Sequence, residues 1–146
     1  MSKSNTFEND LLQLIFNNVD IADIGDASGI QNSATAGSLY VALHTADPGE
    51  AGTATTSETS YGSYARQAVA RTAGGWTVSG NEASNAALVQ FPECSSGTAT
   101  ITHVSITTAV SGASKILYSG ALTASRSVSS GIQPQFAAGA LTVTED

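Results

Sequence analysis

Apolar residues recur at helical spacing only near the N-terminus. The segment 5–18 carries a stripe of apolar residues that lie three or four positions apart, Phe7, Leu11, Leu14 and Ile15, and Leu12 and Phe16 widen this stripe. Asn5 or Thr6 can cap the first turn. The pattern predicts a short helix whose stripe must be buried on its own domain or on a neighbour, so these four residues are candidate interface residues.

Residues 19–37 show no sustained period. Isolated apolar residues alternate there irregularly with Asp, Gly and Ser. Such a pattern is typical of a connecting segment, and we call it the connecting arm. The chain is expected to divide into a helix and arm over 1–37 and one β-domain over 38–146. We also expect that deleting residues 1–18 leaves the β-domain folded.

From residue 38 onward the pattern changes to short alternating runs. In 38–44, Leu39, Val41 and Leu43 would face one way and Tyr40, Ala42 and His44 the other. Further runs cover 64–72, 75–80, 86–91, 99–109, 115–122 and 140–146, with weaker edge runs at 126–131 and 133–136. Because about seven to nine short strands follow one another with only turns between them, they favour an all-β antiparallel sandwich, jelly-roll-like, with an N-terminal helix.

The longest segment without strand character covers residues 45–63, which we call the long loop. It opens on a His44, Asp47 and Glu50 grouping that could suggest a metal site, but only one nitrogen ligand is local. Asp47-Pro48-Gly49 instead favours a tight turn that aims the loop outward from its strand. A loop of this length usually has a function or is mobile. The long loop, with Tyr64 directly after it, therefore supplies the remaining candidate interface residues: Asp47, Glu50, Glu58, Tyr61 and Tyr64.

Charge and composition narrow the class of partner. The formal net charge is −7 and charged residues are 12% of the chain, against about 25% in typical domains. An acidic chain without a basic stripe is not expected to bind nucleic acid, and no apolar run is long enough to span a membrane. Small and hydroxyl side chains must therefore form much of the surface, which lowers the cost of desolvation on contact with another protein.

Catalytic and cofactor motifs are not expected. His103 lies within a predicted central strand, and Cys94, the only cysteine, follows Glu93, whose carboxylate would oppose thiolate formation. The glycines form no nucleotide-binding pattern, and we expect no cofactor or metal. Trp76, Phe91 and Tyr118 are expected to pack in the core.

Several segments together resemble a known protein family. "FENDLLQLIF", "LYVALHTADPGEAG", "TSETSYGSYARQAVART", "GWTVSGNEASNAALVQFPEC", "SGASKILYSGALT" and "ALTVTED" resemble, in this order, small virion structural proteins of tailed bacteriophages. These proteins are often labelled tail-fibre-like and are similar to capsid cement proteins. The resemblance implies a non-enzymatic protein that is made in the host cytoplasm and built into the virion.

Three functions follow as hypotheses. The first is a capsid cement or decoration protein that binds the major capsid protein or other virion proteins, as a homo-oligomer such as a trimer. The alternative is a tail-fibre or tail-tip component that takes part in host attachment. A small hydrolase is the third, and it would require turnover that depends on His44, His103 or Cys94.

Overall fold

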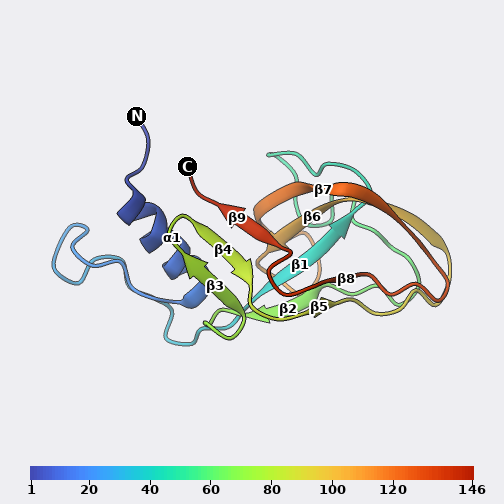
Figure 1. Ribbon diagram of the computed structural model, residues 1–146, viewed down its shortest axis with the longest axis horizontal. Helices are drawn as coiled ribbons and strands as arrows, with labels where there is room; N and C mark the ends of the chain where they lie inside the picture. The colour runs from blue at the N-terminus through green and yellow to red at the C-terminus, as the bar shows by residue number, and fades with distance from the viewer. The chain divides into compact units, whose positions relative to one another are not determined.

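The protein is built from antiparallel strands and a single helix (Figure 1). A computed structural model describes all residues, 1–146. The elements in chain order are α1 (Asn5–Asn17), β1 (Ser38–His44), β2 (Gln67–Ala70), β3 (Trp76–Ser79), β4 (Glu82–Asn85), β5 (Val89–Gln90), β6 (Thr98–Thr107), β7 (Ile116–Ser129), β8 (Gln135–Phe136) and β9 (Thr142–Thr144). This arrangement confirms the predicted all-β fold class with an N-terminal helix.

The chain forms two compact units. One, the helix unit, combines Met1–Ser38, Val69–Leu88 and Phe136–Asp146; the other, the sheet unit, combines Leu39–Ala68 and Val89–Gln135. Each unit is thus assembled from segments that are far apart in the sequence. The only helix has 13 residues, and no helix has the length and apolar character needed to cross a membrane.

In the helix unit, α1 packs on β3 and β4 of the three-stranded sheet β3-β4-β9. Leu12 and Phe16 are fully buried, and the Phe16 ring lies edge-on to Trp76 with ring centroids 4.8 Å apart. The side of the predicted stripe that Leu12 and Phe16 widen is therefore the side that faces the sheet. Ser4, rather than Asn5 or Thr6, caps the helix, since its Oγ accepts from the N–H of Phe7.

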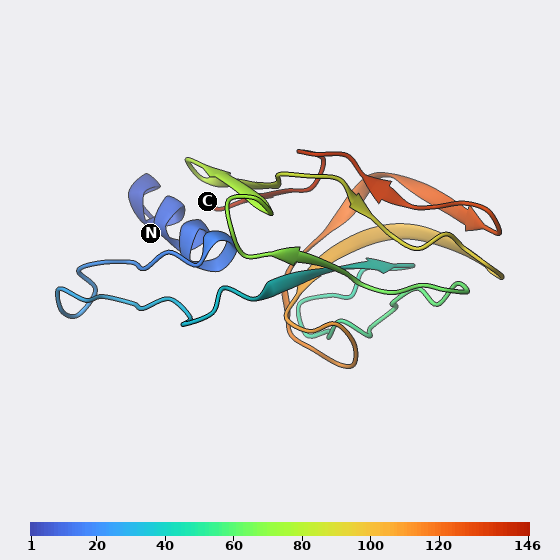
Figure 2. The ribbon, with the colours of Figure 1, turned by 90° about the horizontal axis from the view of Figure 1, so that it is seen from below.

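The connecting arm (19–37) follows α1 as an extended excursion within this unit (Figure 2). Ile21 and Ile30 pair across it by backbone hydrogen bonds of 3.0 and 2.8 Å. Asp20 Oδ1 accepts from the N–H of Asn32 at 2.6 Å. The arm is thus an ordered element held by its own polar side chains.

Arg71 joins the arm to the helix. Its guanidinium donates to the carbonyl oxygens of Leu14 and Ile15 at 2.7 Å each, and to that of Ala36 at 3.1 Å. The carbonyls of Leu14 and Ile15 lie at the C-terminal end of α1, which has no basic residue in its own last turn. Arg71 therefore supplies the positive charge that the helix end favours.

The sheet unit is built around a four-stranded sheet in the order β2-β1-β6-β7. β1 and β6 are antiparallel, with pairs running from Tyr40↔Thr107 to His44↔His103. Leu39, Val41 and Leu43 are buried as the alternation predicts. β7 is the outer strand on one side of this sheet.

Three strand predictions need correction. β4 (Glu82–Asn85) was not predicted, because its inward positions are Ala83 and Asn85, which carry no apolar signal. The run at 86–91 shrinks to β5 (Val89–Gln90), and the runs at 115–122 and 126–131 belong to one strand, β7. Asn85 is buried because its amide donates to two carbonyls and accepts from the N–H of Leu141, which satisfies it fully.

Candidate interaction surface

The long loop (45–63) folds back along β1. The N–H of Thr45 donates to Ser57 O at 2.8 Å, and the N–H of Thr59 donates to Leu43 O at 2.9 Å. The expectation that the loop points outward is therefore wrong. Backbone hydrogen bonds hold its second half alongside the strand from which it starts.

The start of the long loop is the predicted turn. Asp47 Oδ1 accepts from the N–H of Gly49 at 2.9 Å, and Gly49 has φ +69°, which glycine adopts at little cost. The side chains of Asp47 and Glu50 are exposed on either side of Gly49. The turn interpretation is thus confirmed.

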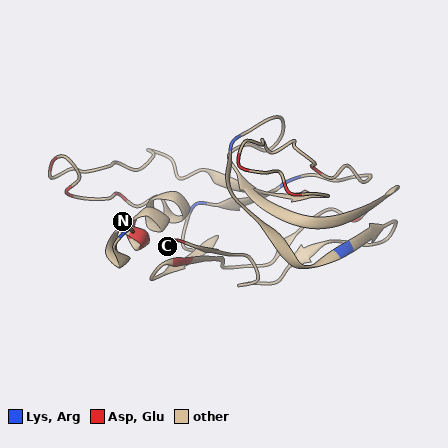
Figure 3. Cartoon of the chain, turned by 90° about the horizontal axis from the view of Figure 1, so that it is seen from above, with Lys and Arg blue, Asp and Glu red and all other residues tan.

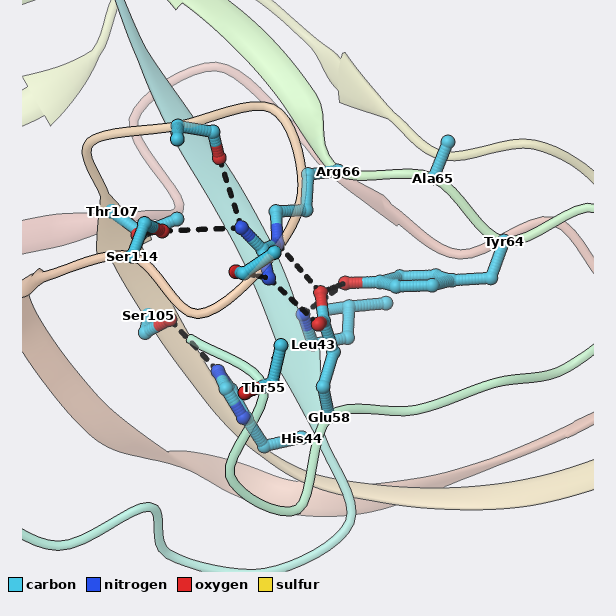
Figure 4. A network of polar contacts seen from close by, with 12 residues as sticks. Leu43, His44, Thr55, Glu58, Tyr64, Ala65, Arg66, Ser105, Thr107 and Ser114 are labelled. Carbon is cyan, nitrogen blue, oxygen red and sulfur yellow. Dashed lines mark hydrogen bonds and ion pairs between the residues drawn. The ribbon is translucent and has the colours of Figure 1, made fainter. Parts of the chain in front are cut away.

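A buried ion pair ties the long loop to the loop between β6 and β7. Arg66 Nε donates to Glu58 Oε1 at 2.7 Å and Nη2 to Oε2 at 2.8 Å, with 2% and 14% of the two side chains exposed (Figure 4). The same guanidinium donates to the carbonyls of Ala109 at 3.0 Å and Gly112 at 2.8 Å. The hydrogen bonds to Glu58 raise the pKa of Arg66. One cation therefore fixes two loops at once.

Tyr64 and Tyr61 brace this network from inside. The hydroxyl of Tyr64 donates to Glu58 Oε1 and accepts from the N–H of Leu43, both at 3.0 Å. Burial raises the pKa of Tyr64, and it raises that of Tyr61 to about 12. Tyr61 is 4% exposed and donates to Pro92 O at 3.1 Å. These two tyrosines and Glu58 thus serve internal contacts.

His44 is paired with a serine beneath the loop. Its Nε2 lies 2.8 Å from Ser105 Oγ (Figure 4), and its Nδ1 lies 2.9 Å from Thr56 O. A carbonyl oxygen only accepts, so Nδ1 carries the proton and Nε2 accepts from the hydroxyl. Burial lowers the pKa of His44. Because His44 is 0% and Ser105 1% exposed, a substrate cannot reach this pair.

We call the exposed residues of the two loops, within 45–57 and 108–113, the two-loop surface. The loops touch directly, since the N–H of Ala54 donates to Ser114 O at 2.9 Å. Their exposed side chains are mostly small or hydroxyl-bearing, with the carboxylates of Asp47 and Glu50 and with Val110, which is 60% exposed. Loops on a rigid sheet with such side chains can present hydrogen-bonding groups to a partner with little loss of conformational entropy.

The remaining candidate interface residues lie in the helix unit. Phe7 is 37% exposed, whereas Leu11, Leu14 and Ile15 are half-buried. The structure therefore separates the nine candidates into a helix group and a long-loop group in different units. Of the candidates in the long-loop group, only Asp47 and Glu50 are exposed.

The sequence interpretation missed Arg66 and the loop that follows β6. A usable signal existed, because only five basic residues occur in the chain. An Arg flanked by Ala65 and Gln67 within a predicted strand would be buried only with an acidic partner. The partner's identity, Glu58, depends on how the long loop folds back.

Other chemical groups are dispersed. No three or more His, Cys, Asp or Glu side chains come together in a way that could hold a metal ion. Cys94 is buried and its Sγ lies 3.2 Å from Ser96 O. His103 has its Nδ1 2.9 Å from the hydroxyl of Thr102. Each of these side chains is thus engaged locally.

One known protein family matches almost the entire chain. Residues 2–144 match the model of a family described as Podophage GP4 fiber I protein gp80. No curated protein matches the chain. The family match spans α1, the connecting arm and every strand.

Proposed function

Since the chain belongs to the podophage GP4 fiber I protein gp80 family, and is therefore a virion structural protein of a tailed phage, we propose that it is a fibre component that contacts the host surface. The description of the family as a fibre protein favours the fibre over the capsid cement function. The match over residues 2–144 is the observation that carries this proposal.

The geometry of the sheet unit supports a contact role. The two-loop surface is held from below by the Arg66–Glu58 pair and by Tyr64, so its exposed groups are positioned before a partner arrives. Its hydroxyls and carboxylates suit recognition through hydrogen bonds. We assign the host contact to this surface, with Asp47, Glu50 and Val110 as its most prominent side chains.

The proposal includes no catalytic activity. A hydrolase would need a nucleophile and a base that a substrate can approach. Ser105 and His44 have the required hydrogen bond but are covered by the long loop. Their role in the proposal is to hold that loop on β1.

Locating the protein in the virion tests the proposal. Gold-labelled antibodies against the purified chain should mark tail fibres on intact virions, and quantitative gels should give a low copy number per particle. Hundreds of copies on the head would contradict the fibre assignment and establish the cement function in its place.

Host contact is tested by reversing charge on the two-loop surface. Phage carrying Asp47→Lys with Glu50→Lys should adsorb to host cells more slowly, by roughly tenfold, as a loss of about 1.4 kcal/mol implies. Glu93→Lys is the matched control, because this exposed carboxylate lies in the sheet unit outside the two-loop surface. Equal adsorption by both variants would remove the two-loop surface from the proposal.

A further inference from the structure

β7 (Ile116–Ser129) presents an open edge. It is the longest strand, with 14 residues, and no strand pairs with its outer side. Its exposed side chains are small apart from one arginine: Ser119, Gly120, Ala121, Thr123, Ala124, Ser125, Arg126, Ser127 and Ser129. Another chain can therefore approach it closely.

The shape of this edge favours a side-chain contact over an added strand. The register passes from His103↔Ala121 to Ile101↔Arg126, so residues 122–125 bulge out of the ladder opposite a single residue of β6. A bulge of this kind interrupts the row of backbone groups that an incoming strand needs. We define residues 115–129 as the β7 edge.

The β7 edge also holds the chain's unpaired positive charge. Of the five basic residues, Lys3 pairs with Glu145 at 3.1 Å, Arg66 pairs with Glu58, and Arg71 donates to carbonyls at the end of α1. Lys115 and Arg126 are exposed and form no ion pair. Both unpaired cations thus lie on one edge.

The connecting arm (19–37) carries the opposite charge to the β7 edge and also exposes apolar side chains. It carries Asp20, Asp23 and Asp26 and no basic residue, and Figure 3 shows acidic positions along it. Its exposed apolar residues are Val19, Ile24 and Ile30, with 48%, 41% and 43% of their surface exposed. Pairing of Ile21 with Ile30, and the contacts of Arg71, keep this segment ordered. Little conformational entropy is then lost when it binds.

We propose that the connecting arm of one copy docks on the β7 edge of a second copy. Asp23 would lie near Lys115 or Arg126 of that copy, while Val19 and Ile24 would cover the small residues of the bulge. Each copy has one arm and one edge, so two copies that exchange the contact form a two-fold dimer, and copies joined head to tail form a ring or a filament. It goes beyond the proposed function, because it concerns self-assembly and does not depend on the position in the virion.

Cross-linking between two single-cysteine variants tests the contact. Ile24→Cys and Thr123→Cys both lie at exposed positions, and native Cys94 is buried. A short bismaleimide should join the two full-length variants when they are mixed, and neither variant alone should cross-link. Cross-linking of Thr123→Cys alone would show an edge-to-edge contact and overturn the proposal, as would a mixture without cross-linked product.

Charge reversal provides a second, independent test of the contact. Lys115→Glu with Arg126→Glu should raise the dissociation constant of the assembly in sedimentation by about tenfold, a loss of about 1.4 kcal/mol. Adding Asp23→Lys in the same chain should restore association, because each arm then meets an edge of opposite charge. Unchanged association in the first variant, or no recovery in the second, overturns the proposal. Both results are independent of where the protein sits in the virion, so they are separate from the fibre test.

Discussion

At the scale of single residues, buried polar groups connect strands to loops. His44 links β1 to Thr56 and to Ser105 of β6, and Arg66 links the long loop to Gly112. Each is a side chain that would be costly to bury alone and is stable because every polar atom has a partner. Both loops are consequently anchored to neighbouring segments by buried side chains.

His44 makes folding stability depend on pH. Burial lowers its pKa in the folded state below 6.5, so below that pH the unfolded chain binds a proton that the folded chain does not. Stability is therefore complete above 6.5 and is lost as pH falls towards the folded pKa. Urea unfolding between pH 7 and 5 should show a decline of at most about 1.4 kcal/mol per pH unit from this group.

Two variants isolate this effect. His44→Gln should lose the component of the decline that His44 supplies, whereas His103→Gln retains His44 and should keep that component. Identical slopes for the native chain and His44→Gln would contradict the assignment.

Glu58→Gln should destabilise the sheet unit strongly. It leaves Arg66, whose side chain is 2% exposed, without its carboxylate, and breaking a buried pair in this way costs about 3–5 kcal/mol. Urea unfolding measures the loss, and Glu50→Gln, at an exposed position of the same loop, should stay within about 0.5 kcal/mol of the native chain. Equal stability of the two variants would mean that the pair does not anchor the loops.

At the scale of elements, α1 and the connecting arm are both held by Arg71, a residue that belongs to neither. α1 has its own N-terminal cap at Ser4 but no basic residue in its last turn. Arg71, which follows β2, supplies that charge and also contacts Ala36 at the end of the connecting arm. The arm's position therefore depends on a residue distant in sequence.

Arg71→Ala should loosen this junction. Loss of the charged hydrogen bonds to Leu14, Ile15 and Ala36 should cost about 1.5–3 kcal/mol in urea unfolding. Amide hydrogen exchange of residues 19–37 should accelerate, because the arm loses its attachment to the helix. Glu93→Ala is the control, since that side chain is exposed and lies outside both the connecting arm and the β7 edge; matching effects of the two substitutions would exclude a bracing role for Arg71.

At the scale of the whole molecule, the two units are built from interleaved segments. Residues 69–88 and 136–146 return to pack with the N-terminal segment. An N-terminal deletion therefore removes part of a packed unit. That the β-domain still folds without residues 1–18 stays a prediction, whereas the helix unit should lose the packing of α1 on β3 and β4.

Deletion of residues 1–18 should expose Trp76. Leu12 and Phe16 are fully buried in the helix unit, and losing them forfeits about 1.5–3 kcal/mol of burial each. Trp76 is the only tryptophan, so its fluorescence reports on this unit alone, and its emission should shift to longer wavelength. Deleting only residues 1–2 keeps the Ser4 cap and should leave the emission unchanged. A native emission spectrum after the longer deletion would show that α1 does not shield the indole.

Local patterns determined much of this protein from the sequence alone. Alternation identified β1, β6 and β9, helical spacing identified α1, and Asp-Pro-Gly identified the turn after His44, because each depends on neighbours a few residues apart. Tertiary structure decided which polar side chains are buried, because their partners lie far away in the sequence. Glu58, Tyr61 and Tyr64 became bracing residues because the long loop folds back, and Asn85 could be buried in β4 because segment 137–141 satisfies its amide. Buried polar side chains such as Arg66 and Asn85 are satisfied by hydrogen-bond partners, and those partners come from parts of the chain that no local pattern connects.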